Sequence, residues 1–279
     1  MAAYLRPGNL GEALTALNRG RLSVIAGGTD FYPARVETTA EEDVLDISGL
    51  GELRRIKAMP RYVRIGACVT WSDLMRADLP RSFDGLKLAA REIGGIQIQN
   101  AGTVVGNLCN ASPAADGLPN LLALDAEVEL ASLDGVRRVP ASEFVTGSRK
   151  TARRSDELVT ALLIPNLATE ARSDFLKLGS RKYLVISIVM VAVVIEPVDG
   201  YVQGARVAVG ACSEIARRLP VLEAALRGRP LDGELARAVN AESLSALSPI
   251  DDLRGSAAYR RKAALVLLRR SLNRLAAAA

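Results

Sequence analysis

Apolar residues near the start of the chain recur at helical spacing. The positions i, i+3, i+4 and i+7 are filled by Leu10, Ala13, Leu14 and Leu17. This stripe predicts a helix with one buried face. Asn9 can cap its first turn, Glu12 is placed to complete a capping box, and Gly20 can end the helix.

Short apolar runs between polar segments predict strands at residues 22–26, 43–47 and 61–67. Residues 128–138 read as a hairpin that turns at Asp134-Gly135. Helices are expected after the cap Thr70, over residues 86–93, and from Asp116 and Pro119 through Leu124. The first half of the chain therefore mixes α and β elements.

The second half has a different order of elements. Three strands are expected at residues 175–178, 185–195 and 205–211, and Asp199-Gly200 connects the last two. Helices are expected at residues 219–226, 231–246 and 256–275. The elements of the first half end near Pro165. We therefore expect two domains, residues 1–168 and 169–279.

The longest apolar run extends from Tyr183 to Ile195 and contains 13 residues, with Ser187 among them. A helix that crosses a membrane needs about 20 apolar residues. The run is rich in Val and Ile, which favours a buried strand. We therefore expect no membrane span.

Composition is that of an ordinary globular protein. Of 279 residues, 49% are hydrophobic and 24% charged, which argues against disorder and collagen-like repeats. Histidine is absent, which excludes catalysis that needs an imidazole base and metal sites built on imidazole. The three cysteines, Cys68, Cys109 and Cys212, are too few for a four-thiolate metal site and indicate a reducing compartment.

The net charge and the first residues of the chain bear on possible partners and on localisation. The net charge of +5 comes without a recognition helix or interleaved aromatics, so binding to nucleic acid is not expected. Arg6 and Pro7 stand where a signal peptide would be apolar, so we expect a cytoplasmic protein. The basic run from Arg149 to Arg154 is typical of a solvated face, with docking to a partner as the alternative.

The first candidate site is the turn Ala26-Gly27-Gly28-Thr29-Asp30, which directly follows an expected strand. Two glycines let the backbone curl, so that its N–H groups can point at an anion such as a diphosphate. The segment fits neither a Walker A loop nor GxGxxG. An ordinary tight turn is an equally good interpretation of these five residues.

The second candidate is the long segment from Gly94 to Asp116, which contains mostly Gly, Ala, Asn, Ser, Thr and Gln. Short polar side chains with small spacers can wrap closely around a polar ligand. A plain surface loop of that length is uncommon in a compact domain. The functional interpretation is therefore favoured over a structureless loop.

Five blocks in order resemble one known family, the FAD-binding medium subunit of the molybdenum hydroxylases, which includes aerobic carbon monoxide dehydrogenase and xanthine dehydrogenase. The blocks are AGGTD, QNAGTVVGNLCNASPAAD, GSRKT leading to Ile164-Pro165, FLKLGSR, and PIDDLRGS with Tyr259-Arg260-Arg261. The resemblance runs from Tyr4 to about Leu272.

The resemblance implies an α+β fold. It implies an FAD-binding domain of two α/β subdomains followed by a three-stranded antiparallel sheet with helices. It also implies that FAD is held by Val24, Ile25, Ala26, Gly27, Gly28, Thr29, Asp30, Phe31, Thr103, Gly106, Asn107, Asn110, Asp116, Leu158, Val159 and Lys177. No catalytic side chain and no metal ligand are expected, because the redox chemistry belongs to the flavin.

Simpler roles exist for several of these residues. Asn107 and Asp116 can cap turns or a helix, and Lys177 can be a solvated strand residue. The plain alternative for Leu158 and Val159 is strand core.

The chain departs from the family pattern at two positions. Val105 stands where the family usually has a second glycine, and a β-branched residue resists positive φ. We therefore expect Val105 to disturb the loop or weaken FAD binding, and Val105→Gly to be neutral or favourable. Val185 stands where relatives often carry an acid.

The resemblance implies an electron-transfer subunit. Its expected partners are a large molybdenum-cofactor subunit and a small [2Fe-2S] subunit, in a dimer of heterotrimers, with FAD passing electrons to an external acceptor. Two alternatives stay open: a stand-alone flavin reductase or oxidase, and a nucleotide-binding scaffold subunit that has lost FAD.

Overall fold

The computed structural model of the protein describes residues 2–35 and 42–278. The chain begins with a small three-stranded parallel sheet in the order β1 (Tyr4–Leu5), β3 (Val44–Asp46), β2 (Ser23–Ile25). Helix α1 (Leu10–Arg19) buries the predicted apolar stripe, and the Asn9 side chain accepts a hydrogen bond from the Glu12 N–H at 3.0 Å. The predicted capping box is wrong in its other half. The Glu12 carboxylate accepts from the Gly8 N–H at 2.7 Å instead of from the N–H of the cap residue Asn9.

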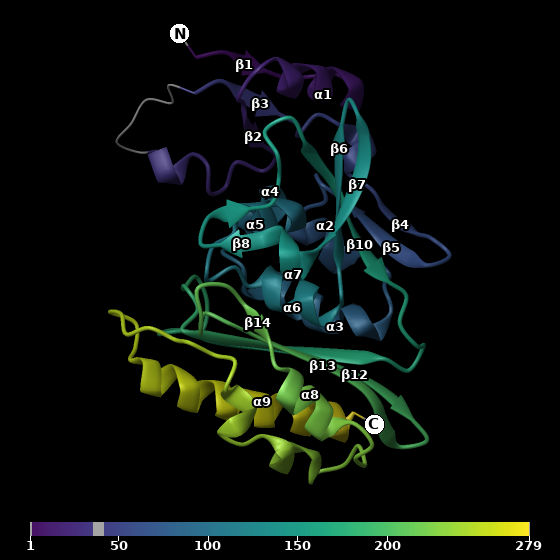
Figure 1. Ribbon diagram of the computed structural model, residues 1–279, viewed down its shortest axis with the longest axis vertical. Helices are drawn as coiled ribbons and strands as arrows, with labels where there is room; N and C mark the ends of the chain where they lie inside the picture. Colours follow the sequence, from purple (N-terminus) through teal and green to yellow (C-terminus); the bar gives the residue numbers. More distant parts are fainter. Residues whose placement is uncertain (1, 36–41, 279) are drawn as a thin grey trace.

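A five-stranded antiparallel sheet forms the middle of the molecule (Figure 1). Its strand order is β4 (Ile56–Ala58), β5 (Tyr62–Gly66), β10 (Leu158–Pro165), β6 (Glu127–Ser132), β7 (Gly135–Pro140). The β6–β7 hairpin confirms the predicted hairpin, with Leu133 and Asp134 in the turn and Gly135 as the first residue of β7. The central strand, β10, comes from far along the chain and is buried over nearly its whole length.

Short helices surround this sheet. They are α2 (Trp71–Arg76), α3 (Asp84–Glu92), α4 (Ile96–Ala101), α5 (Val104–Asn110), α6 (Gly117–Ala123) and α7 (Ala141–Phe144), with 3-10 turns η1 (Pro33–Arg35), η2 (Gly51–Leu53) and η3 (Arg81–Phe83). Thr70 caps α2 through a complete capping box with Asp73. A two-stranded hairpin, β8 (Val145–Gly147) and β9 (Lys150–Thr151), follows α7.

The C-terminal sheet is antiparallel and has four strands, so the three strands expected from the family resemblance are corrected to four. Their order is β11 (Arg172–Leu178), β12 (Val189–Val198), β13 (Tyr201–Gly210), β14 (Arg217–Arg218). The added strand, β14, is only two residues long and consists of arginines, so neither length nor apolar alternation marks it in the sequence.

Both faces of this sheet are covered. Along β12, Met190, Ala192 and Val194 belong to the core that extends into the N-terminal half, while Val191 and Val193 belong to a second core. Helices α3 and α6 pack on the first face, and α8 (Pro220–Leu226) and α9 (Ala257–Ala277) pack on the other. In Figure 1 α8 and α9 lie below this sheet, and α3 and α6 lie above it. A strand buried on both faces reads as a continuous apolar run, which explains the Val and Ile richness of the sequence here.

Two expectations in this half are wrong. The strand begins at Val189 and not at residue 185: the side chains of Tyr183, Leu184 and Ile186 are at least 50% exposed. The helix expected over residues 231–246 is replaced by two 3-10 turns, η4 (Leu235–Ala238) and η5 (Glu242–Leu244). Between them the Asn240 side chain accepts a hydrogen bond from the Ser243 N–H at 2.9 Å, a local bond that competes with a continuous helix.

The loop disturbance expected at Val105 is wrong, while its effect on FAD binding stays a prediction. The segment from Gly94 to Asp116 contains α4 and α5, and Val105 lies in the first turn of α5 with 3% exposure, packed in the core. A helical residue needs no positive φ, so the β-branched side chain causes no strain there. Across residues 2–35 and 42–278, no helix is long and apolar enough to cross a bilayer.

Candidate functional site

The two glycine-containing segments meet at one cleft of about 650 Å³. One wall is the turn that follows β2, with η1 behind it. The opposite wall is formed by the connection between α4 and α5 and by α5 itself, and the β8–β9 hairpin closes one side. Gly28 and Asn107, which lie 79 positions apart in the sequence, both line this space.

The walls touch at Gly27. A Cβ atom built on Gly27 would lie 2.0 Å from the carbonyl oxygen of Ala101 and 2.9 Å from Cα of Gly102, both backbone atoms. Any larger residue would therefore push the two segments apart. The next residue, Gly28, has φ +65°, in the left-handed region that favours glycine. Gly27 thus allows the two segments to approach closely, and Gly28 allows the left-handed backbone conformation of the turn.

The cleft presents hydrogen-bond donors. Among the described residues no acceptor is found for the backbone N–H groups of Gly28, Thr29 and Asp30. Asn107 and Asn110 use their side-chain oxygens, to accept from the Gly117 N–H at 3.3 Å and from Arg149 respectively, which leaves their amide N–H groups to face other partners. Successive free backbone N–H groups form an anion-binding concavity. This donor set fits the diphosphate of a dinucleotide.

The structure brings most of the predicted site residues together. The cleft is lined by Val24, Ile25, Ala26, Gly27, Gly28, Thr29, Asp30, Phe31, Thr103, Gly106, Asn107 and Asn110. Four predicted residues lie elsewhere. Leu158 and Val159 are buried in β10 as part of the core, at 2% and 4% exposure, and Asp116 and Lys177 form a separate buried pair.

This buried pair joins the two halves of the chain. Lys177 Nζ on β11 lies 2.7 Å from Asp116 Oδ2 before α6, and the Ser187 hydroxyl donates to Asp116 Oδ1 at 2.5 Å. Burial raises the pKa of Asp116, and the Lys177 ammonium with the two hydrogen bonds opposes that rise. Both roles suggested by the sequence, a capping Asp116 and a solvated Lys177, give way here to an ion pair between α6 and β11.

The cleft also contains residues that sequence reasoning missed. They are Ala34, Arg35, Trp71, Ile93, Ile98, Gly102, Cys109 and Arg149. Arg35 lies over the Phe31 ring at 3.8 Å and pairs with Glu42. Trp71 is 1% exposed and forms part of the floor. Arg149 belongs to the basic run noted in the sequence, but spacing alone gave no sign that it reaches the AGGTD turn.

The cysteines do not form a metal centre. All three are free, and burial raises the pKa of each thiol to about 12, so they stay protonated at neutral pH. Within the described part of the chain, no group of three or more cysteine and acidic residues could hold a metal ion.

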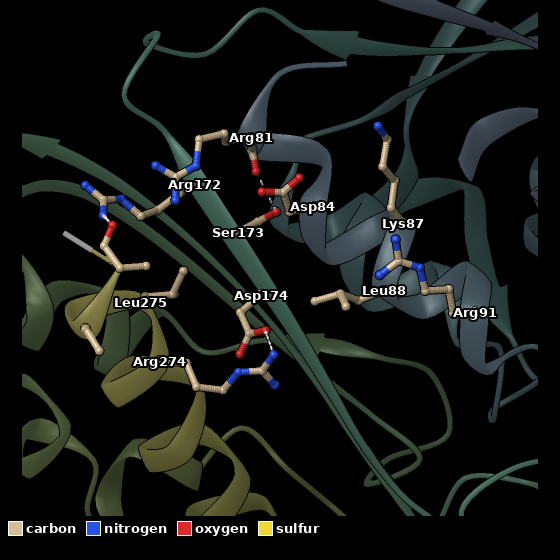
Figure 2. Close-up of a pocket in the computed structure, with 12 residues that line it drawn as sticks. Arg81, Asp84, Lys87, Leu88, Arg91, Arg172, Ser173, Asp174, Arg274 and Leu275 are labelled. Atoms are coloured by element: carbon tan, nitrogen blue, oxygen red, sulfur yellow. Dashed lines mark hydrogen bonds and ion pairs between the residues drawn. The ribbon is translucent and has the colours of Figure 1, made fainter. Parts of the chain in front are cut away.

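A second cavity, of about 560 Å³, lies where α3, β11 and the end of α9 meet (Figure 2). Its lining includes more basic than acidic residues. The Arg172 guanidinium donates to the Ala278 carbonyl at 2.7 Å, and Arg274 lies 3.5 Å from Asp174. These contacts hold α9 against β11, so the cavity is a junction between elements.

Fold and cleft together define a dinucleotide-binding subunit. Residues 1–167 match the family described as the FAD binding domain in molybdopterin dehydrogenase. Residues 174–275 match the family described as the CO dehydrogenase flavoprotein C-terminal domain. The chain belongs to the FAD-binding medium subunits of the molybdenum hydroxylases.

Individual relatives agree over nearly the whole chain. The nicotine 6-hydroxylase medium subunit of Paenarthrobacter nicotinovorans is 30% identical over 96% of this chain and 95% of its own length. The putative xanthine dehydrogenase FAD-binding subunit of Escherichia coli (strain K12) is 29% identical over 100% and 97%. A chain of the reconstituted CO dehydrogenase from Oligotropha carboxidovorans superposes with a TM-score of 0.92, at 29% identity, over 100% of this chain and 99% of that chain.

Proposed function

We propose that this chain is the FAD-binding electron-transfer subunit of a molybdenum hydroxylase complex. In that role it receives electrons from the [2Fe-2S] clusters of a small subunit and delivers them to an external acceptor, while a large subunit oxidises the substrate at molybdenum. We further propose a dimer of heterotrimers, and the division of the chain at residue 168. The observation that carries the proposal is the convergence of the AGGTD turn and α5 on one donor-rich cleft.

When bound, FAD supplies the redox chemistry, and the protein has to bind and orient it. The backbone N–H groups of residues 28–30 and the amides of Asn107 and Asn110 would hold the diphosphate. Apolar side chains in the cleft, Val24, Ile93 and Ile98, would contact the flat parts of the molecule. Contacts of FAD with Asp116, Leu158, Val159 and Lys177 also remain proposals. These four residues do not line the cleft.

FAD binding is measured by titrating the purified full chain and following flavin absorbance at about 450 nm together with thermal unfolding. FAD should bind and raise the melting temperature. Asn107→Leu should remove FAD binding while the chain still folds, because an apolar side chain replaces a donor at the cleft. Asn18→Leu, on the exposed face of α1, is the matched control and should bind FAD normally.

A wild-type chain that neither binds FAD nor is stabilised by it would overturn the proposal and favour the scaffold alternative. The argument for that alternative was Val105, and its place in the core removes the reason to expect a damaged cleft. Turnover of a reduced donor by the chain alone would favour a stand-alone reductase. Co-purification with a large and a small chain supports the complex.

A further inference from the structure

The proposed ligand creates a charge problem at the rim of the cleft. A diphosphate carries negative charge, and the Asp30 carboxylate lies at the same rim, 55% exposed. Among the described residues that line the cleft, Arg35 and Arg149 carry a positive charge. Arg35 is held by Glu42 and by the Phe31 ring. Arg149 instead pairs with Asp30 at the rim itself, which places its charge where the diphosphate would lie.

Arg149 spans the two walls. It lies in the β8–β9 turn, and its backbone N–H donates to the Ala111 carbonyl at the end of α5, at 2.8 Å. Its guanidinium lies 2.8 Å from Asp30 Oδ2, in the AGGTD turn, and also contacts the Asn110 carbonyl oxygen at 3.3 Å and the Asn110 side-chain oxygen. One side chain thus crosses the opening between the two segments predicted to bind FAD.

The β8–β9 turn holds Arg149 in an uncommon backbone conformation. Arg149 has φ +59°, in the left-handed region that residues other than glycine rarely adopt. Its ion pair with Asp30 is more than half exposed on both sides, and exposed ion pairs contribute little to stability. A strained backbone that yields only a weak surface pair is typical of a functional position.

We infer that Arg149 is a diphosphate-binding residue that Asp30 and Asn110 hold in place until the dinucleotide arrives. On binding, the guanidinium exchanges the Asp30 carboxylate for phosphate oxygens, which its planar fork can grip through two parallel N–H bonds. This inference rests on the proposed function and adds specificity to it. Arg149 favours a flavin that carries a diphosphate over riboflavin, which has no phosphate.

The test compares the dissociation constants of FAD and riboflavin for the full-length wild type, Arg149→Gln, Arg149→Lys and Lys150→Gln. Lys150 is the matched control, because it is the exposed neighbour on the same hairpin, carries the same charge and does not line the cleft. Arg149→Gln should weaken FAD binding by about 5- to 30-fold, and Arg149→Lys by less, because lysine keeps the charge but not the fork. Lys150→Gln should change FAD affinity less than about twofold.

Two further readouts separate phosphate contact from a general effect on the cleft. Riboflavin affinity should be the same in all four proteins. The ratio between wild type and Arg149→Gln should shrink when salt rises from about 50 mM to about 300 mM, because the lost contact is electrostatic.

The outcomes distinguish this inference from the proposed function. If wild type binds FAD and Arg149→Gln matches Lys150→Gln, the inference is wrong and the proposed function stands. The same holds if Arg149→Gln loses riboflavin as strongly as FAD. If wild type does not bind FAD at all, both are overturned.

Discussion

At the scale of single residues, the cleft depends on Gly27. Gly27→Ala would place a methyl group 2.0 Å from the Ala101 carbonyl oxygen, and neither backbone segment can move without opening the contact. We expect this variant to lose about 1 to 3 kcal/mol of unfolding free energy, as overpacked positions do, and to bind FAD more weakly. Chemical denaturation and FAD titration measure the two effects.

Gly20→Ala is the control for that variant. Gly20 has extended backbone, with φ 179°, and a Cβ there would meet nothing within 4 Å. Its stability and FAD affinity should stay close to wild type. Equal behaviour of the two alanine variants would show that the contact between the AGGTD turn and α4 is unimportant.

Single residues also show how far the sequence could be read. The AGGTD turn was visible because paired glycines after an apolar run mark a turn that can accept an anion. The contact between Arg149 and Asp30 was not visible, because it joins residues 119 positions apart and depends on where the β8–β9 hairpin folds back. Features that depend on neighbouring residues can be predicted from the sequence, whereas contacts between distant segments depend on tertiary packing.

At the scale of elements, α5 changes the expectation for Val105. Its side chain is 3% exposed in the first turn of a helix, so Val105→Gly would remove a buried side chain and add a flexible residue to the helix. We expect a loss of about 2 to 4 kcal/mol, from lost burial and from the low helix propensity of glycine. Thermal or urea denaturation would show it.

Val105→Ala separates the two contributions, because it keeps helix propensity and loses only part of the burial. It should lie between wild type and the glycine variant. A glycine variant as stable as wild type, or one that binds FAD more tightly, would mean that this segment is not helical and that the family's paired glycines matter here too.

Elements with strong local signals were predicted well. Helices α1 and α9 have caps at Asn9 and Ser256, and Asp134-Gly135 marks the β6–β7 hairpin. The failures have local causes. Asn240 breaks the expected helix through its own side-chain bond, and β14 is too short to show any periodicity. The segment from Gly94 to Asp116 forms two helices because apolar side chains such as Val104 and Leu108 pack into the core.

At the scale of the whole molecule, Asp174 gives the junction of α3, β11 and α9 a pH dependence. Its carboxyl is 4% exposed, its Oδ2 has no hydrogen-bond partner among the described residues, and burial raises its pKa above the usual 3.8. The basic residues that line the same cavity are Arg81, Lys87, Arg91, Arg172 and Arg274. At neutral pH the buried carboxylate therefore costs stability, despite the neighbouring Arg274.

The sign follows from linkage. Below the pKa of the unfolded chain both states are protonated and the cost is absent. As the pH rises above that value the unfolded chain ionises first and stability falls, until the pH exceeds the raised folded pKa and the full cost of the buried carboxylate is reached. Asp174→Asn should therefore be as stable as wild type or more stable at pH 8, by about 1 kcal/mol. That advantage should disappear as the pH is lowered toward about 4. Melting temperatures of both proteins across this range measure the difference.

Asp84→Asn removes a second acid from the same cavity, one that is only partly buried and lies in the first turn of α3. It should be neutral or slightly destabilising, because an acid at that place favours the helix. If Asp174→Asn is the less stable protein at pH 8, the ion pair with Arg274 outweighs the cost of burial.

The C-terminal sheet, buried on both faces, ties the two halves of the protein together. The alternate residues of β12 supply one hydrophobic core with Met190 and Val194 and the other with Val191 and Val193. Because β12 belongs to both hydrophobic cores, it cannot separate from one core without disrupting the other. Unfolding of either core would expose a valine-rich apolar surface to water. We therefore expect thermal unfolding to be one cooperative transition, in which the cleft is lost together with the C-terminal sheet.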